Sequence, residues 1–246
     1  MKAVIQCGGK GMRLRPYTTI LPKPLMPIGD KPVLLLLLRW LRRNGIRDVY
    51  ITTGYLGHLI RSYCGNGRQW DLQIEYTEEN EPMGTMGALS LLRSELDTTF
   101  LVLNGDVVTD LNLNALAERH RRMKSGLTVA TVNRNLRVDF GLIETRDQRV
   151  VRFREKPTLS HLVSMGVYCL DPETLEHIPD GVPFGFDDLM FRMLELGVPV
   201  GTFLHKGFWL DVGRIEDFQK AQELEMDDEV PAYDSAPLSL EALDAL

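Results

Sequence analysis

Cysteine is scarce in this chain of 246 residues, and its three cysteines are far apart, with no Cys-x-x-Cys pair. That spacing excludes a disulfide framework and a zinc site built on paired thiols, and it is typical of reduced thiols in a cytosolic protein. The five histidines also lack the spacing of metal ligands. We therefore expect a cytoplasmic protein in which the cysteines and histidines have ordinary structural roles.

Long apolar runs and an excess of basic charge are missing as well. The longest apolar run, residues 33–38, is too short to cross a bilayer, and the chain begins with a strand-like segment instead of a charged leader. The net charge is −6, and residues 227–246 contain six acids and no Lys or Arg, so the remaining chain is neutral overall. We therefore expect neither a membrane nor a nucleic acid as a partner.

Strand-like and helix-like segments alternate through the first half of the chain. Such alternation predicts βαβ units, and hence an α/β fold of the Rossmann-like, three-layer kind with a mostly parallel mixed sheet. Ligands of such sheets bind at the carboxyl ends of the strands. The predicted strands are residues 3–5, 49–53, 72–76 and 99–103, and the predicted helices are residues 32–44, 56–63, 85–94 and 113–124.

The second half of the chain is more irregular. Short β segments are predicted at residues 127–132, 141–144, 150–153 and 163–170, followed by helices at 184–196 and 215–226. We interpret the β segments as an insertion that supplies a second wall of the cleft. This organisation predicts one domain over residues 1–226, in two parts of about 1–126 and 127–226, with an acidic tail over 227–246.

Three glycines, Gly8, Gly9 and Gly11, follow the first predicted strand directly. Without a Cβ, these residues let backbone N–H groups approach an anion closely. The spacing is neither that of a P-loop nor the dinucleotide pattern Gly-x-Gly-x-x-Gly. Cations near the same loop suit a polyphosphate ligand; they are Lys10, Arg13, Arg15 and Lys23.

Two carboxylates also follow apolar segments. Asp106 ends the predicted strand at 99–103 in the sequence Asn-Gly-Asp, and Asp211 follows residues 208–210. A lone Asp after a strand is most often a turn residue. Two such residues from different strand ends, however, supply the hard oxygen ligands that Mg²⁺ needs when it shares its remaining positions with water and phosphate.

The glycine motif at residues 8–14, together with Pro-Lys-Pro at 22–24, resembles the signature of the sugar-1-phosphate nucleotidylyltransferases, also called NDP-sugar pyrophosphorylases. Further motifs occur in the family's order at residues 81–89, 104–106, 155–157 and 165–168, so the similarity spans residues 2 to about 223. The resemblance implies the fold of the nucleotide-diphospho-sugar transferases. It also implies an Mg²⁺-dependent enzyme that converts an NTP and a sugar 1-phosphate into an NDP-sugar and pyrophosphate.

The same resemblance assigns roles to individual residues, with the nucleotide in the first part of the domain and the sugar phosphate in the second. It implies nucleotide binding by Gly8, Gly9, Gly11, Met12, Arg13, Gly84, Thr85 and Gly87, and sugar-phosphate binding by Gly141, Glu155, Lys156 and Gly166. It implies metal binding by Asp106 and Asp211, and catalytic roles for Arg13, Lys23, Asp106 and Lys156.

The chain departs from the family pattern at three places: Met12 replaces a Thr, Gln6-Cys7 replaces Leu-Ala, and Ser164 replaces an Asn. The loop at 81–88 is most similar to guanylyltransferases, which favours GTP with a mannose- or heptose-type sugar phosphate. Alternatives remain: a glucose-1-phosphate enzyme using dTTP, UTP, CTP or ATP, a non-catalytic regulatory subunit, or a glycosyltransferase, although its Asp-x-Asp motif is missing. A homo-oligomer is compatible with the sequence, and we expect residues 227–246 to be dispensable for turnover.

Overall fold

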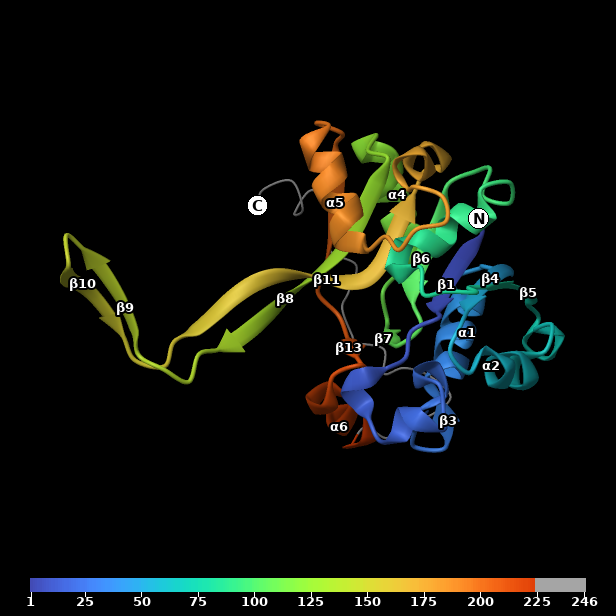
Figure 1. The fold of residues 1–246 in the computed structure, drawn as a ribbon, viewed down its shortest axis with the longest axis horizontal. Helices are drawn as coiled ribbons and strands as arrows, with labels where there is room; N and C mark the ends of the chain where they lie inside the picture. The colour runs from blue at the N-terminus through green and yellow to red at the C-terminus, as the bar shows by residue number, and fades with distance from the viewer. Residues whose placement is uncertain (224–246) are drawn as a thin grey trace.

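The computed structural model describes residues 1–223, so the acidic segment 227–246 lies outside the described residues. One seven-stranded sheet, in the order β12-β8-β11-β6-β1-β4-β5, organises the molecule (Figure 1). The strands are β1 (Ala3–Cys7), β4 (Asp48–Thr53), β5 (Gln73–Glu78), β6 (Phe100–Asn104), β8 (Leu127–Arg137), β11 (Thr158–Leu170) and β12 (Val200–His205). All neighbours pair in parallel except β11, which is antiparallel to both β6 and β8. The predicted mostly parallel, mixed α/β sheet is confirmed.

The sheet is buried on both faces because its strands are apolar at successive positions. Along β1, Ala3, Ile5 and Cys7 belong to one core cluster and Val4 to the other, as the alternation of side chains along a strand requires. A strand covered on both sides needs such a continuous apolar run. This explains why the first strand could be recognised from three residues.

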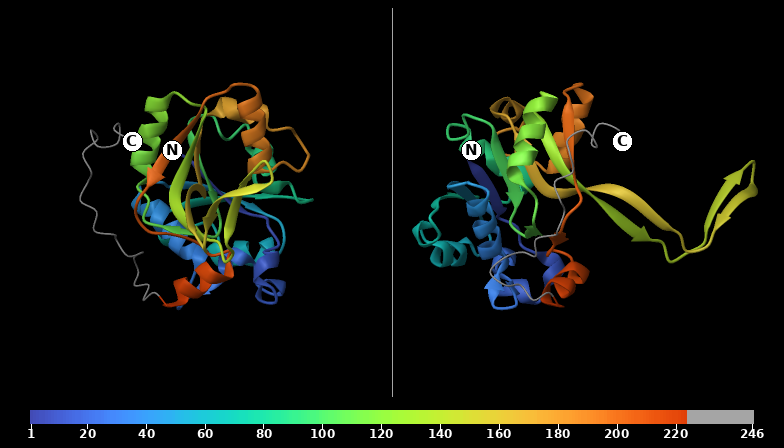
Figure 2. Two further views of the ribbon diagram at one scale, coloured as in Figure 1. Left: turned by 90° about the vertical axis from the view of Figure 1, so that its left-hand side faces the viewer. Right: turned by 180° about the vertical axis from the view of Figure 1, so that it is seen from behind.

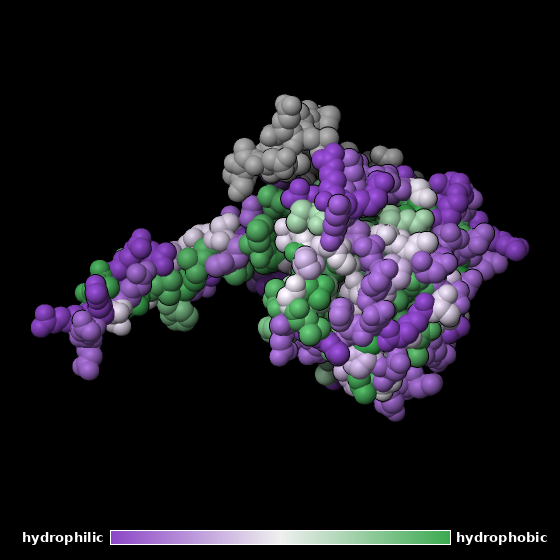
Figure 3. Space-filling view, turned by 90° about the horizontal axis from the view of Figure 1, so that it is seen from above, coloured by the Kyte–Doolittle hydropathy of each residue, from purple (hydrophilic) through white to green (hydrophobic). Residues whose placement is uncertain are grey.

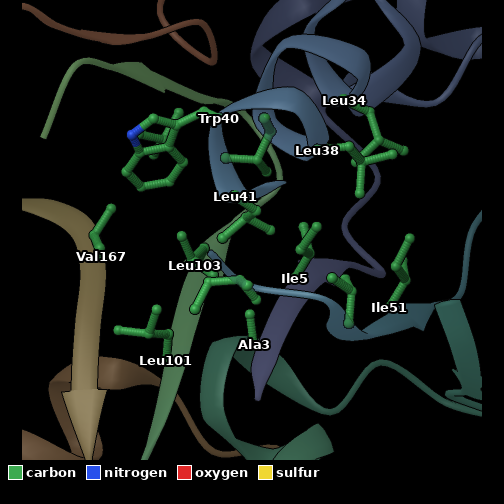
Figure 4. Packing of buried hydrophobic residues seen from close by; sticks show 14 of the residues in the cluster. Ala3, Ile5, Leu34, Leu38, Trp40, Leu41, Ile51, Leu101, Leu103 and Val167 are labelled. Carbon is green, nitrogen blue, oxygen red and sulfur yellow. The ribbon is translucent and has the colours of Figure 1, made fainter. Parts of the chain in front are cut away.

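Helices cover both faces of the sheet. Helices α1 (Val33–Arg43), α2 (Gly57–Cys64) and α4 (Leu113–Met123) pack on one face, and α3 (Gly84–Gly87), the 3₁₀ helix Ala88–Leu92 and α5 (Phe186–Glu195) pack on the other. Figure 4 shows Leu34, Leu38 and Leu41 of α1 directed at Ile5 and Leu103 of the sheet. This spacing of apolar residues is that of one helix face. Among residues 1–223, no helix is both long and apolar enough to span a membrane.

The helix predicted at residues 85–94 forms differently. It consists of the four-residue α3 followed by the 3₁₀ helix Ala88–Leu92. The N–H groups of Met86 and Gly87 both donate to the carbonyl oxygen of Phe184, at 2.9 Å each. The Phe184 carbonyl oxygen, which lies just before α5, therefore accepts hydrogen bonds from N–H groups at the start of this helix. These bonds fix α3 against the segment that precedes α5.

The largest difference from the sequence-based expectation concerns residues 135–160, which we call the arm. Strands β8 and β11 continue as a two-stranded ribbon beyond the sheet, and the hairpin of β9 (Leu142–Arg146) and β10 (Arg149–Arg154) forms its tip. Figures 1 and 2 show the ribbon projecting away from the body, in views from opposite sides. The insertion thus does not form a second wall of its own chain's cleft, because its strands are exposed and none of its residues lines the cleft.

Candidate active site

A cleft of about 390 Å³ opens at the carboxyl ends of β1 and β6, where ligands of parallel sheets bind. This volume is within the usual range of small-molecule sites. The residues that line it are Gln6, Cys7, Gly8, Gly9, Gly11, Met12, Arg13, Lys23, Pro24, Glu79, Pro82, Gly84, Thr85, Asn104, Gly105, Asp106 and Gly213. The cleft therefore gathers the glycine loop, the Pro-Lys-Pro segment, the start of α3 and the end of β6, as the motifs predicted.

The glycine loop forms the floor of the cleft between β1 and the 3₁₀ turn Met12–Leu14. Gly11 has a φ of +60°, and a Cβ there would lie 2.9 Å from the Thr18 side chain. Thr18 also fixes the loop by donating to the Gly11 carbonyl oxygen at 2.9 Å. At Gly8, a Cβ would collide with the carboxylate of Glu79. The positive φ therefore favours glycine at position 11, and at position 8 a side chain would displace the Glu79 carboxylate.

Two of the four predicted cations, Arg13 and Lys23, line the cleft, whereas Lys10 and Arg15 are exposed and do not. The Lys23 ammonium forms an ion pair with the Asp106 carboxylate. Burial lowers the pKa of Lys23 to about 8; the nearby Asp211 carboxylate opposes this shift and the charge of Arg13 adds to it.

Asp106 and Asp211 are brought together by a small antiparallel pair of strands, β7 (Val107–Thr109) and β13 (Trp209–Asp211). Asp211 lies opposite Val107, and the Val212 N–H donates to the Asp106 carbonyl oxygen at 3.0 Å. Asp106 is buried. Within residues 1–223, no group of three or more His, Cys, Asp and Glu side chains forms a metal cage. Asp106 lines the cleft and Asp211 does not, and two neighbouring carboxylates are nevertheless the kind of ligand that Mg²⁺ takes together with water and substrate.

Two polar residues that line the cleft, Gln6 and Glu79, were not predicted as binding residues. Both amide atoms of Gln6 are buried and have no hydrogen-bond partner among the described residues. Burial raises the pKa of the Glu79 carboxyl, and a hydrogen bond from the Met83 N–H opposes the shift. Glu79 directly follows β5, so the rule that ligands meet strand ends could have identified it.

Thr85 and Cys7 also line the cleft, but each already has a structural environment. The Thr85 hydroxyl accepts a hydrogen bond from the Phe186 N–H at 2.8 Å, which ties α3 to the start of α5. Gly87, which we also predicted to bind nucleotide, packs against the backbone of Val182 and does not line the cleft. Burial raises the pKa of the Cys7 thiol well above its ordinary value, so this cysteine is not a nucleophile at neutral pH.

The predicted sugar-phosphate residues are divided between two places. Gly166 belongs to the body, where a Cβ would lie 2.5 Å from the Asn104 side chain at the rim of the cleft. Gly141, Glu155 and Lys156 belong to the arm, and a Cβ at Gly141 would lie 3.0 Å from a Glu155 carboxylate oxygen. None of these four residues lines the cleft of the described chain. The structure thus assembles three of them with one another, away from the nucleotide loop.

Residues 2–228 match the family described as nucleotidyl transferase. The chain belongs to this family. It is 33% identical over 225 residues to a D-glycero-alpha-D-manno-heptose 1-phosphate guanylyltransferase of Aneurinibacillus thermoaerophilus, covering 91% of this chain and 97% of that protein. It is 32% identical over 241 residues to a UTP--glucose-1-phosphate uridylyltransferase of Synechocystis, covering 90% of this chain. The chain spans 62% of the length of the Synechocystis protein.

Membership of the nucleotidyl transferase family is matched by the fold. The crystal structure of HddC from Yersinia pseudotuberculosis complexed with GMP-PN has a TM-score of 0.72 and 26% sequence identity, covering 90% of this chain and 98% of that one. The family match and these relatives confirm the resemblance to sugar-1-phosphate nucleotidylyltransferases that the sequence motifs indicated.

Proposed function

We propose that this chain transfers a nucleotidyl group from an NTP to a sugar 1-phosphate, giving an NDP-sugar and pyrophosphate. The observation that carries the proposal is the convergence, in one cleft, of an open glycine loop with Arg13, Lys23 and Asp106. Backbone N–H groups and two cations suit a triphosphate, and the neighbouring carboxylates suit its metal ion. The relatives named above act in the same reaction class, which supports the proposal.

The reaction needs alignment and charge stabilisation more than proton transfer. A phosphate oxygen of the sugar 1-phosphate attacks the α-phosphorus in line, the bond from that phosphorus to the bridging oxygen of the β-phosphate breaks, and pyrophosphate leaves. The nucleophile is anionic at neutral pH, so no general base is required. Arg13 and Lys23 stabilise the negative charge that spreads over the phosphates, as fixed cations do in other phosphoryl transfers.

The metal in this proposal is Mg²⁺, held by Asp106 and Asp211. Mg²⁺ supplies charge neutralisation at the phosphates when it is bound. The two carboxylates come from neighbouring strands, and the Gly213 backbone lies against both the Lys23 ammonium and Asp106. We infer that Lys23 moves from Asp106 to a phosphate oxygen when the metal and the nucleotide bind, which keeps every charge in the cleft paired.

The base is guanine in this proposal, because of Glu79. Guanine presents two adjacent N–H donors on its pairing edge, and one carboxylate can accept from both, whereas thymine and uracil present one donor between two carbonyl acceptors. Glu79 lines the cleft and already accepts a hydrogen bond from the Met83 N–H, and Gln6, whose amide has no partner among the described residues, lines the same cleft. The heptose-phosphate relative uses guanylyl transfer and the solved HddC structure contains GMP-PN, which supports GTP with a manno-configured sugar phosphate.

The test is pyrophosphate release from a matrix of five NTPs and the 1-phosphates of mannose, manno-heptose and glucose, with Mg²⁺. We expect the highest kcat/KM for GTP with a manno-configured sugar phosphate. A preference for UTP with glucose 1-phosphate would replace the guanylyl assignment with that of the Synechocystis relative and retain the reaction class. If no pair released pyrophosphate above the rate of the Asp106→Asn variant, the catalytic proposal itself would be wrong.

A further inference from the structure

The arm carries residues of the proposed reaction that the cleft of the same chain lacks. Glu155 and Lys156 follow β10 directly, where the tip hairpin joins the ribbon of β8 and β11, and Gly141 lies against Glu155. The cleft in the body is lined by the nucleotide-binding residues, and none of the described residues 107–212 contributes to it. Under the proposed function, a cleft with a triphosphate site is therefore incomplete without a second element that grips the sugar phosphate.

The arm is also unstable as an isolated element. Its tip is a two-stranded hairpin, and such hairpins are at best marginally stable in water unless another surface covers them. Large apolar side chains are nevertheless exposed along it, as the green band on the projecting segment in Figure 3 shows. They are Leu136, Phe140, Ile143, Val150, Val151 and Phe153. A hydrophobic stretch of this extent on a protruding ribbon indicates a protein-binding surface.

The root of the arm is fixed to the body, so its direction is set there. Arg134 donates two hydrogen bonds to the Asp217 carboxylate, at 2.7 and 2.8 Å, and Asp217 is 1% exposed. The Arg134 guanidinium also lies over the Trp209 ring, whose N–H donates to the Met165 carbonyl oxygen at 2.9 Å. These contacts hold β8 and β11 together where they leave the sheet. The ribbon then pairs without interruption as far as Arg137 and Thr158 and projects away from the body (Figure 1).

We propose that two copies of this chain exchange arms, so that Glu155 and Lys156 of each copy complete the cleft of the other; this inference rests on the proposed function. Each arm thus binds to the body of a second, identical chain. An exchange of this kind is reciprocal and closes as a twofold dimer. It covers the apolar side chains of both arms and brings the ammonium of Lys156 to the phosphates.

The body offers a matching surface beside the cleft. Met12, Tyr17 and Ile20 follow the glycine loop and are 56%, 63% and 79% exposed. These are large apolar side chains on the segment that follows the glycine loop, as expected for the core of an interface in which Phe140 and Phe153 of the incoming arm would be buried. Strand β10 also carries Arg149, Arg152 and Arg154 ahead of Lys156, and the last two of these arginines pair with Glu144 of β9 within the hairpin.

Complementation between inactive variants tests the exchange directly. Asp106→Asn disables the body's cleft, and Lys156→Ala disables the arm. The two full-length chains are coexpressed with different tags, and the mixed dimer is isolated by successive affinity steps. Arm exchange leaves one intact site in each mixed dimer, so pyrophosphate release at low sugar phosphate should recover to about half of the wild-type value. The matched control is the mixed dimer of Asp106→Asn with Asp211→Asn, in which both changes disable the body and no recovery is expected.

Light scattering gives a second readout that does not depend on turnover. The wild-type chain should have the mass of a dimer, and Phe153→Glu, on an exposed side chain, should shift it toward the monomer, whereas Phe191→Glu on α5 should not. The exchange would be overturned if the mixed dimer of Asp106→Asn with Lys156→Ala recovered no pyrophosphate release, or if the chain were fully active as a monomer. If the wild-type chain released no pyrophosphate but Phe153→Glu still abolished the dimer, the proposed function would fail and arm-mediated pairing would stand.

Discussion

The cleft and the arm differ in what holds their residues in place. Around the cleft, Gln6 of β1 is in register with Thr52 of β4 and with Asn104 of β6, and all three strands are buried on both faces. In the arm, Glu155 and Lys156 are exposed and follow a hairpin whose strands pair only with each other. Burial of the core thus determines the positions of the cleft residues, whereas local pairing alone determines those of the arm.

Strand β8 is buried in the body at one end and exposed in the arm at the other. Residues 127–131 of β8 are buried in the sheet, while residues 135–137 are exposed. The strand keeps its extended backbone on both sides of Arg134 but has an apolar environment on only one. Chemistry placed on the buried part is fixed by the core of its own chain, and chemistry placed on the exposed part can be used by a neighbour.

The largest expected effect is the loss of turnover when carboxylates of the proposed metal site are substituted. Asp106→Asn and Asp211→Asn keep the size of the side chain and remove charge from the proposed metal site. Metal charge stabilisation is worth several kcal/mol, so turnover should fall by about 10³-fold or more. Steady-state pyrophosphate release over a range of Mg²⁺ checks this, with the melting temperature as the control for folding. Near wild-type turnover of Asp106→Asn at saturating Mg²⁺ would contradict the metal assignment.

Substitutions in the cleft and in the arm should change different kinetic parameters. Arg13→Ala removes a cation that acts on the reacting triphosphate, so kcat should fall with every sugar phosphate. Lys156→Ala removes a contact to the second substrate, so KM for sugar phosphate should rise while kcat changes less. The loss of one charge-assisted contact costs about 1.5–3 kcal/mol, which corresponds to about 10- to 150-fold in each parameter. Initial-rate measurements with each substrate varied will distinguish the two. An effect of Lys156→Ala on the NTP dependence alone would disprove the role of the arm in sugar-phosphate binding.

The sequence predicted the cleft better than the arm for the same physical reason. Apolar runs marked the buried strands, and the motifs at their ends converge, with Gly8, Lys23 and Asp106 in one cleft. The arm has no such apolar pattern. The residues around Arg134 are polar, so the sequence did not indicate that β8 extends to residue 137 or that β11 begins at residue 158. Glu79 was missed because it belongs to no motif. Its position directly after β5 was the available signal, and the sheet order, which places β5 beside β4, brings it to the cleft.

Substitutions at Glu79 and Gln6 should have a more modest effect, on the preference for one nucleotide base over another. Glu79→Gln keeps the shape of the side chain but replaces one acceptor oxygen by a donor group, so one of the two proposed hydrogen bonds to guanine becomes a repulsion. Recognition of this kind is worth about 1–3 kcal/mol, so the ratio of kcat/KM for GTP over UTP should fall by about 5- to 150-fold. Competition between the two nucleotides measures the ratio directly. Gln6→Leu is the companion variant, since it removes an amide without changing charge, and an unchanged ratio in both would move base recognition elsewhere.

The smallest expected effect near neutral pH is the pH dependence of the wild-type chain. Burial lowers the pKa of Lys23 from 10.5 to about 8, so its positive charge is lost as the pH rises through 8. Because kcat/KM reports the free enzyme, kcat/KM for the NTP should be halved near pH 8 and fall about tenfold per unit above it. Lys23→Arg, which stays charged, should remove this decline even if its absolute rate is lower. Between pH 8 and 10.5 the unfolded chain binds more protons at this lysine than the folded chain does, so the titration itself adds stability as the pH rises. A falling melting temperature over pH 7–9 would therefore point to another group, and a decline that persists in Lys23→Arg would show that the ammonium of Lys23 is not the charge on which the cleft depends.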